Sequence, residues 1–96
     1  MTERRAFVVT GGGDDRRRVL VGDRLLVGRD ASCELVIRDL SASRRHLEII
    51  AADSTYLCRD LSSRNGTRVN GEEVAERELA DGDEIQLGNT VLRCEL

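Results

Sequence analysis

The sequence predicts an all-β fold, an antiparallel β-sandwich, on three observations. Apolar residues alternate with polar ones in short pieces, the pattern of strands with one buried face. Glycine, asparagine and aspartate separate these pieces at close intervals, as turns between antiparallel strands require. The 96 residues, 40% of them hydrophobic, are too few for two separate cores, so we expect residues 1–96 to form one domain.

The expected elements of the N-terminal half follow in chain order. The alternation is carried by residues 6–10, 18–21 and 24–27. Between the first two strands, the glycine-rich residues 11–15 predict a flexible turn. Gly22 and Asp23 predict a two-residue hairpin that pairs the strand before them with the strand after them.

The C-terminal half continues in the same way. The pattern predicts, in order, a strand at 46–51, a turn at 52–54, a strand at 55–60, turns at 69–72, 80–83 and 87–90, and a last strand at 90–96. In the first of the later turns, Asn70-Gly71 is a pair favoured in type I′ hairpins. In the last strand, Leu92, Cys94 and Leu96 lie on one face.

Residues 71–79 are the one segment whose composition favours a helix, because glutamate, alanine and arginine are good helix formers. Nine residues bounded by glycine and Asp-Gly are too few for a stable unsupported helix. We therefore expect an irregular loop, with Val74 and Leu79 as two core anchors.

Charge and hydropathy exclude several function classes. The 15 basic residues, all of them arginine, are outnumbered by 18 acidic ones, and a net charge of -3 argues against a nucleic-acid partner. Apolar runs reach only three or four residues, as in 6–9, where a membrane span needs roughly 18. Residues 1–5 lead into no signal-peptide stretch. We expect a cytoplasmic protein without a membrane partner.

The three cysteines, Cys33, Cys58 and Cys94, cannot all pair and contain no C-x-x-C spacing. This favours buried, reduced thiols over a disulfide framework or a zinc site. The sequence therefore predicts no metal site.

Three segments at strand ends, residues 28–33, 40–46 and 60–67, concentrate arginine, serine, asparagine and glycine with few carboxylates. Guanidinium groups, hydroxyls, amide donors and accessible backbone N–H groups are what proteins use to hold a dianionic phosphate. Because loops gather at the ends of a sandwich, we expect these segments to form the functional site.

Four motifs occur in order at these junctions: Gly28-Arg29, Ser43-Arg44-x-His46, Asp60-Leu61-x-Ser63-x-Asn65-Gly66-Thr67 and Val69-Asn70-Gly71. In this order they make the chain resemble the forkhead-associated (FHA) domain family over nearly its whole length. The resemblance implies a twisted, SMAD/FHA-like sandwich of about eleven short strands. It further implies a non-catalytic, cofactor-free adaptor that docks a threonine-phosphorylated protein or peptide, downstream of a Ser/Thr kinase.

The resemblance also implies roles for individual residues. Arg29 corresponds to the family's phosphate- and peptide-contacting arginine, and Ser43 to the serine whose hydroxyl reaches a phosphate oxygen. Arg44 stands where the family often has a second phosphate ligand. Asn65 matches the asparagine that holds the main chain of the bound peptide.

The remaining motif residues support or modify this site. By the same resemblance His46 braces the binding loops, Gly28 permits a tight turn before the arginine, and Gly66 supports the loop after the asparagine. The sequence departs from the family at Arg64, where many members have a phosphate-contacting threonine. We include Arg64 among the phosphopeptide-binding residues.

Two alternatives remain open at this point. The sandwich could be a phosphate-independent interaction module that binds a partner surface or its own flanking segment, and Thr2 and Thr10 leave an intramolecular switch open. Ser43 and His46 could instead form a hydrolase pair, although no nucleophile-elbow or oxyanion-hole pattern accompanies them.

Overall fold

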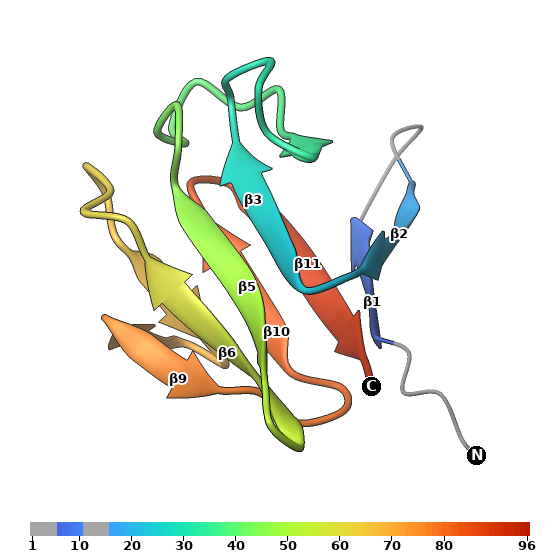
Figure 1. The fold of residues 1–96 in the computed structure, drawn as a ribbon. Helices are drawn as coiled ribbons and strands as arrows, with labels where there is room; N and C mark the ends of the chain where they lie inside the picture. Colours follow the sequence, from blue (N-terminus) through green and yellow to red (C-terminus); the bar gives the residue numbers. More distant parts are fainter. Residues whose placement is uncertain (1–5, 11–15) are drawn as a thin grey trace.

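The computed structural model describes residues 6–10 and 16–96 (Figure 1). These residues form eleven strands: β1 (Ala6–Thr10), β2 (Arg18–Val21), β3 (Arg24–Gly28), β4 (Leu35–Val36), β5 (Leu47–Ala52), β6 (Thr55–Asp60), β7 (Thr67–Val69), β8 (Glu72–Val74), β9 (Glu76–Glu78), β10 (Glu84–Leu87) and β11 (Thr90–Glu95). The expected all-β class is confirmed. Within the described residues no helix could span a membrane. The turn predicted at 11–15 lies outside the described residues.

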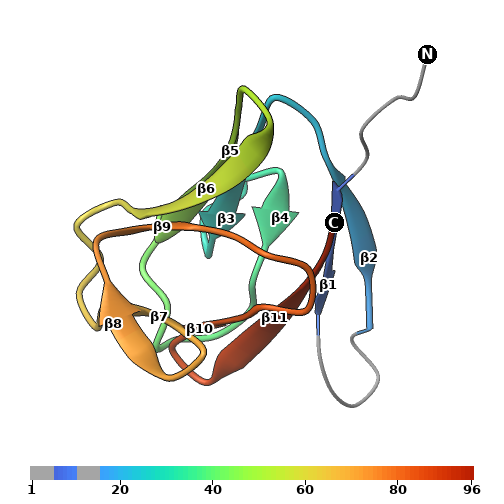
Figure 2. The same ribbon diagram turned by 90° about the horizontal axis from the view of Figure 1, so that it is seen from below.

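The strands form two sheets that face each other across the core, as Figure 2 shows. One sheet has the order β2-β1-β11-β10-β7-β8 and the other the order β4-β3-β5-β6-β9. Neighbouring strands in the described residues pair antiparallel except β3 and β4, which are parallel with Val27 opposite Leu35. The chain is therefore the sandwich that the sequence predicts, with one parallel pair that it does not.

The core lies between the sheets and follows the predicted alternation. In β11, Leu92 and Cys94 are buried while Val91 and Arg93 point outward. Leu96, expected on the same face as Leu92, lies beyond the end of β11 and is exposed. The facing sheet covers each inward side chain, so the apolar positions of the alternating pattern are the buried positions of the strand.

The three cysteines are free and buried, as expected. Burial raises the pKa of Cys58 and of Cys94 to about 12, because the core disfavours a thiolate. These two thiols are protonated near neutral pH and behave as small core side chains.

The hairpin predicted at Gly22 and Asp23 is wrong. β2 pairs with β1, whereas β3 pairs with β5 and β4 in the other sheet. The two residues carry the chain across the sandwich, and the Ala51 N–H donates to the Asp23 carbonyl at 2.9 Å to hold the crossing. A two-residue turn signal is local, and it does not state which sheet the next strand joins.

The loop predicted over residues 71–79 is also wrong, because it contains β8 and β9. Asn70 and Gly71 have φ values of 51° and 86°, as a type I′ turn requires, and they return the chain along β7. β9 then pairs with β6 in the other sheet. These ladders satisfy backbone groups that an irregular loop would leave to water.

One candidate for the intramolecular switch can be placed. Thr10 is 2% exposed, and its hydroxyl accepts a hydrogen bond from the Arg17 N–H at 2.7 Å. A kinase cannot reach this hydroxyl in the folded chain. Thr2 lies outside the described residues.

Candidate functional site

The three predicted loops meet at one end of the sandwich, toward the top of Figure 1. Backbone hydrogen bonds join the first to the second: the Arg29 N–H donates to the Ser43 carbonyl at 3.1 Å, and the Asp30 N–H to the Arg44 carbonyl at 3.0 Å. The third loop joins through Arg64, whose N–H donates to Ser43 Oγ at 2.9 Å. Segments far apart in the sequence therefore form one surface.

His46 is the buried junction of these loops, with 0% exposure. Its Nδ1 accepts a hydrogen bond from the Ser43 N–H at 3.0 Å, so Nε2 carries the ring proton and donates to the Gly66 carbonyl at 2.8 Å. Its own backbone N–H and carbonyl bond to Val27 and Leu61 at 2.9 Å each. This side chain fixes the distance between the second and third loops.

Gly28 is required by a close approach of two backbones. It is the last residue of β3, and a Cβ atom added there would lie 2.1 Å from the Arg44 carbonyl oxygen. The tight turn expected at this glycine is therefore not the reason for it, since its φ lies outside the left-handed region. Gly66, by contrast, has a φ of +83°, which disfavours any residue with a side chain.

A pocket of about 450 Å³ lies between the loops. Its lining consists of Arg29, Leu40, Ser41, Ala42, Ser43, Arg44, Arg64 and Asn65, with no aspartate or glutamate among the described residues. Five of the predicted site residues, including all three predicted arginines, are thus brought together. Three positive charges around a pocket free of carboxylates make it a site for an anion.

The arginines present donors to this pocket. Arg29 Nε donates to the Ala42 carbonyl at 2.6 Å, which orients the guanidinium and leaves its terminal amino groups without a partner among the described residues. Arg44 and Arg64 are exposed, and within the same residues their guanidinium groups form no ion pair. Asp30 is the nearby acidic group: hydrogen bonds from Ser32 lower the pKa of its carboxyl, and the charge of Arg44 contributes to this lowering.

Ser43 and Asn65 complete the polar lining. Because Ser43 Oγ accepts the Arg64 N–H, its hydroxyl proton is free to donate toward the pocket. Asn65 Nδ2 donates to the Ser41 carbonyl at 2.9 Å, which holds the amide in place; its second N–H and its oxygen form no hydrogen bond within the described residues.

The geometry gives Ser43 no general base. Both ring nitrogens of His46 are engaged by backbone groups, and the Ser43 hydroxyl contacts the Arg64 N–H rather than the imidazole. A serine hydrolase needs the opposite arrangement, with the imidazole on the hydroxyl.

Asp39 fixes the second loop and was missed by the sequence reasoning. Its carboxylate accepts the N–H groups of Ser41 and Asn89 and the Thr90 hydroxyl, at 2.8, 2.7 and 2.8 Å. Burial raises the pKa of Asp39, but these hydrogen bonds outweigh it and hold the pKa below its ordinary value. The Asp-x-Ser spacing was the available signal, since it is typical of a local Asx turn.

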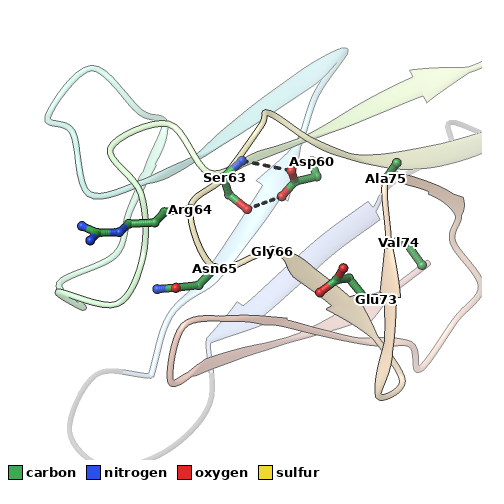
Figure 3. Close-up of a pocket in the computed structure, with 8 residues that line it drawn as sticks. All are labelled: Asp60, Ser63, Arg64, Asn65, Gly66, Glu73, Val74 and Ala75. Carbon is green, nitrogen blue, oxygen red and sulfur yellow. Dashed lines mark hydrogen bonds between the residues drawn. The ribbon is translucent and has the colours of Figure 1, made fainter.

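Asp60 fixes the third loop in the same manner. Its carboxylate accepts the N–H and the hydroxyl of Ser63, drawn in Figure 3, and the Thr67 hydroxyl at 2.7 Å. Burial raises the pKa of Asp60, but the hydrogen bonds from Ser63 and Thr67 outweigh this effect and hold the pKa below its ordinary value of 3.8. Ser63 therefore closes a local turn.

Leu40 and Ser41 are further lining residues that the sequence reasoning missed. Leu40 is 92% exposed at the tip of the second loop, and a single exposed leucine leaves no periodic signal.

In the part of the chain that the structure describes, no cluster of three His, Cys, Asp or Glu side chains could hold a metal ion.

A second pocket of about 380 Å³ adjoins the first (Figure 3). It is lined by Asp60, Ser63, Arg64, Asn65, Gly66, Glu73, Val74 and Ala75. Arg64 and Asn65 line both pockets, so the two form one continuous surface. Glu73 was not foreseen, because β8 was expected to be loop.

The chain matches one protein family along most of its length. The model of the FHA domain matches residues 25–88. The chain is 45% identical over 65 residues to FHA domain-containing protein FhaA of Mycobacterium tuberculosis, covering 68% of this chain and 12% of FhaA. It is 35% identical over 83 residues to the Glycogen accumulation regulator GarA of the same organism, covering 85% of this chain and 51% of GarA.

A solved structure gives the same result for the fold. A domain studied in a structural and functional analysis of phosphothreonine-dependent FHA domain interactions superposes with a TM-score of 0.87 at 33% identity, covering 97% of each chain. The curated relatives are longer: this chain spans 51% of GarA and 12% of FhaA.

The Asp60 hydrogen bonds predict an acid-dependent stability. A carboxyl group whose pKa is lowered by folding stabilises the protein above its ordinary pKa, and this stabilisation is lost as the pH falls through the lowered value. Asp60→Asn leaves one N–H or hydroxyl of the turn without an acceptor and should cost about 1–3 kcal/mol near pH 7. The difference in the free energy of unfolding between wild type and Asp60→Asn should shrink as the pH falls below 3.8, the ordinary pKa of the carboxyl group.

Urea unfolding at neutral and acidic pH measures this effect. The matched control is Asp23→Asn, which removes the same charge from an exposed side chain that makes no hydrogen bond within the described residues. Equal stability of Asp60→Asn and wild type at neutral pH would contradict the assignment.

Proposed function

This chain belongs to the FHA domain family, and from that membership we propose that it binds a threonine-phosphorylated segment of a partner protein. The binding site is the pocket of about 450 Å³ between the three loops. The observation that carries the proposal is the lining of this pocket, with Arg29, Arg44 and Arg64 and no carboxylate among the described residues. FHA domains are non-catalytic binding modules, and we propose an adaptor without catalytic activity.

The chemistry of a phosphothreonine fits this lining. The phosphate brings about -1.5 to -2 charges and three strong acceptor oxygens. We assign Arg29 and Arg44 to charge-assisted hydrogen bonds with those oxygens, and the Ser43 hydroxyl, whose proton is free, to a third. The Asn65 amide holds the main chain of the ligand, so that binding depends on the phosphate and on an extended backbone together.

The setting of this interaction is also part of the proposal. A phosphothreonine ligand requires a Ser/Thr kinase upstream, and we place the domain of residues 1–96 in the cytoplasm, where such kinases act. We propose no nucleic-acid or membrane partner. The rival function is binding of an unphosphorylated surface or flanking segment, which the same exposed loops could provide.

A titration with paired peptides tests the proposal. A phosphothreonine peptide of suitable sequence should bind with a micromolar Kd, on the order of -8 kcal/mol, and the same peptide with plain threonine should bind too weakly to measure. Because the second pKa of the phosphate is about 6, affinity should fall from about pH 7.5 to about pH 5.5, and added salt should weaken it. Equal binding of both peptides would favour the phosphate-independent rival.

Two variants distinguish a ligand contact from loop support. Arg29→Ala removes donors that face the pocket and should cost about 2 kcal/mol or more of binding with little change in Tm. His46→Ala leaves the Ser43 N–H and the Gly66 carbonyl unpaired and should lower stability by about 1–3 kcal/mol, with binding lost through disorder of the loops.

Thermal unfolding and peptide titration of the same samples separate these outcomes. Arg45→Ala is the matched control, because Arg45 is exposed in the same loop but does not line the pocket. A His46→Ala variant that melts like wild type and yet binds nothing would make the histidine a ligand contact.

Arg64 should set a preference for negative residues beside the phosphothreonine. An exposed guanidinium next to Asn65 reaches the phosphate or an acidic side chain a few residues further along the ligand. We expect acidic residues C-terminal to the phosphothreonine to strengthen binding by about 0.5–1 kcal/mol each. Arg64→Thr should weaken this preference, keep phosphate binding and sharpen selection of phosphothreonine over phosphoserine.

A phosphopeptide library profile measures the preference in wild type, Arg64→Thr and the control Arg45→Thr. The wild-type profile should survive in the control. A profile unchanged by Arg64→Thr would show that the flanking preference has another source.

A further inference from the structure

The two adjoining pockets differ in charge, and the geometry points to a second contact for the ligand. We propose that the pocket of Figure 3 binds a basic side chain of the phosphopeptide, lysine or arginine, with the Glu73 carboxylate as its acceptor. The inference rests on the proposed function, because it concerns a residue that flanks the phosphothreonine in the same ligand.

The position of the pocket makes this contact accessible to a bound peptide. Arg64 and Asn65 line both pockets, so a ligand main chain held at Asn65 lies at their boundary. An extended peptide advances about 3.3 Å per residue, and its side chains point alternately to either side. A side chain within a few residues of the phosphothreonine therefore reaches the second pocket while the phosphate occupies the first.

The carboxylate that faces this pocket is Glu73. It lies against the third loop, since a Cβ atom added at Gly66 would be 3.0 Å from Glu73 Oε1. Figure 3 shows Gly66 between Asn65 and Glu73, with the Asn65 and Arg64 side chains extending away from the carboxylate. Of the two pockets, only the second is lined by carboxylate residues, Glu73 and Asp60, while Arg64 lines both.

Glu73 is available because no arginine of the described residues forms an ion pair with it. Arg68 stands opposite it in the β7–β8 register, yet the two form no ion pair within the described residues. The neighbouring Glu72 pairs with Arg77 at 3.1 Å. Of two adjacent glutamates on β8, one is neutralised by the protein and the other is left facing the pocket.

The other walls suit a long basic side chain. Val74 and Ala75 provide apolar surface for the methylene stem of a lysine or arginine, whose charged end reaches the carboxylate. Asp60 adds negative charge, but its oxygens already accept hydrogen bonds from Ser63 and Thr67. Glu73 is therefore the acceptor that remains.

A lysine scan of the ligand tests the inference. One phosphothreonine peptide with alanine flanks is compared with peptides that carry a single lysine at each of about four positions on either side. Kd values are measured at low ionic strength for wild type, Glu73→Gln and the control Glu72→Gln. Both variants remove one negative charge from an exposed side chain of β8.

We expect lysine at one position, or at two alternate positions, to tighten wild-type binding about two- to fivefold, the size of an exposed ion pair. Glu73→Gln should abolish this gain and Glu72→Gln should keep it. The inference is overturned if no position gains, if the gain survives Glu73→Gln, or if both variants lose it equally, which would indicate a diffuse charge effect.

The peptide without lysine separates this inference from the proposed function. Loss of phosphate dependence in that peptide would refute the proposed function and the inference with it. Phosphate-dependent binding with a flat lysine scan would refute the Glu73 contact alone.

Discussion

The buried imidazole of His46 is the constraint on which the binding surface depends. It joins the Ser43 N–H to the Gly66 carbonyl, and it can do so only with a proton on Nε2 and none on Nδ1. The backbone approach at Gly28 adds a second restriction, because a Cβ atom at this position would lie 2.1 Å from the Arg44 carbonyl oxygen. With these two contacts made, the loops have little freedom relative to the sheets.

A net charge of -3 is compatible with an anion site because no aspartate or glutamate lines the first pocket, and several carboxylates are engaged elsewhere. Asp39 and Asp60 accept hydrogen bonds inside the loops, and neither lines the first pocket. On the outer face of the second sheet, Glu48 and Glu76 neutralise Arg24 and Arg59. The overall charge therefore says little about the local field, which depends on which groups are already paired.

Much of the fold could be predicted from the sequence, and the errors have a physical cause. Alternation reports burial, so it found the strands that line the core, such as β11. It could not show that the chain crosses between sheets at Gly22 and Asp23, because pairing is decided by tertiary contacts. β8 and β9 have three residues each and are mostly exposed, so they leave too short a pattern to recognise.

The site residues that belong to sequence motifs could be predicted. Those that reach the site only through the fold could not. Arg29, Ser43, Arg44, Arg64 and Asn65 line one pocket as the motifs implied. Leu40 and Glu73 belong to no motif: Leu40 is a single exposed residue of the second loop, and Glu73 reaches the third loop only because the fold places β8 beside it. The reason for Gly28 was also hidden, since a close approach of two chains has no local signature.

These differences divide the site into a frame and a set of contacts. The frame consists of His46, Asp39 and Asp60 with the loop groups that they hydrogen-bond. Because these bonds order the loops before a ligand arrives, little conformational entropy is lost on binding. The contacts are exposed side chains with few protein partners, and changing one alters a charge without breaking the frame. In the binding mode that we propose, Arg29 and the loop frame retain phosphate recognition, while Arg64 and Glu73 select the flanking residues of the ligand.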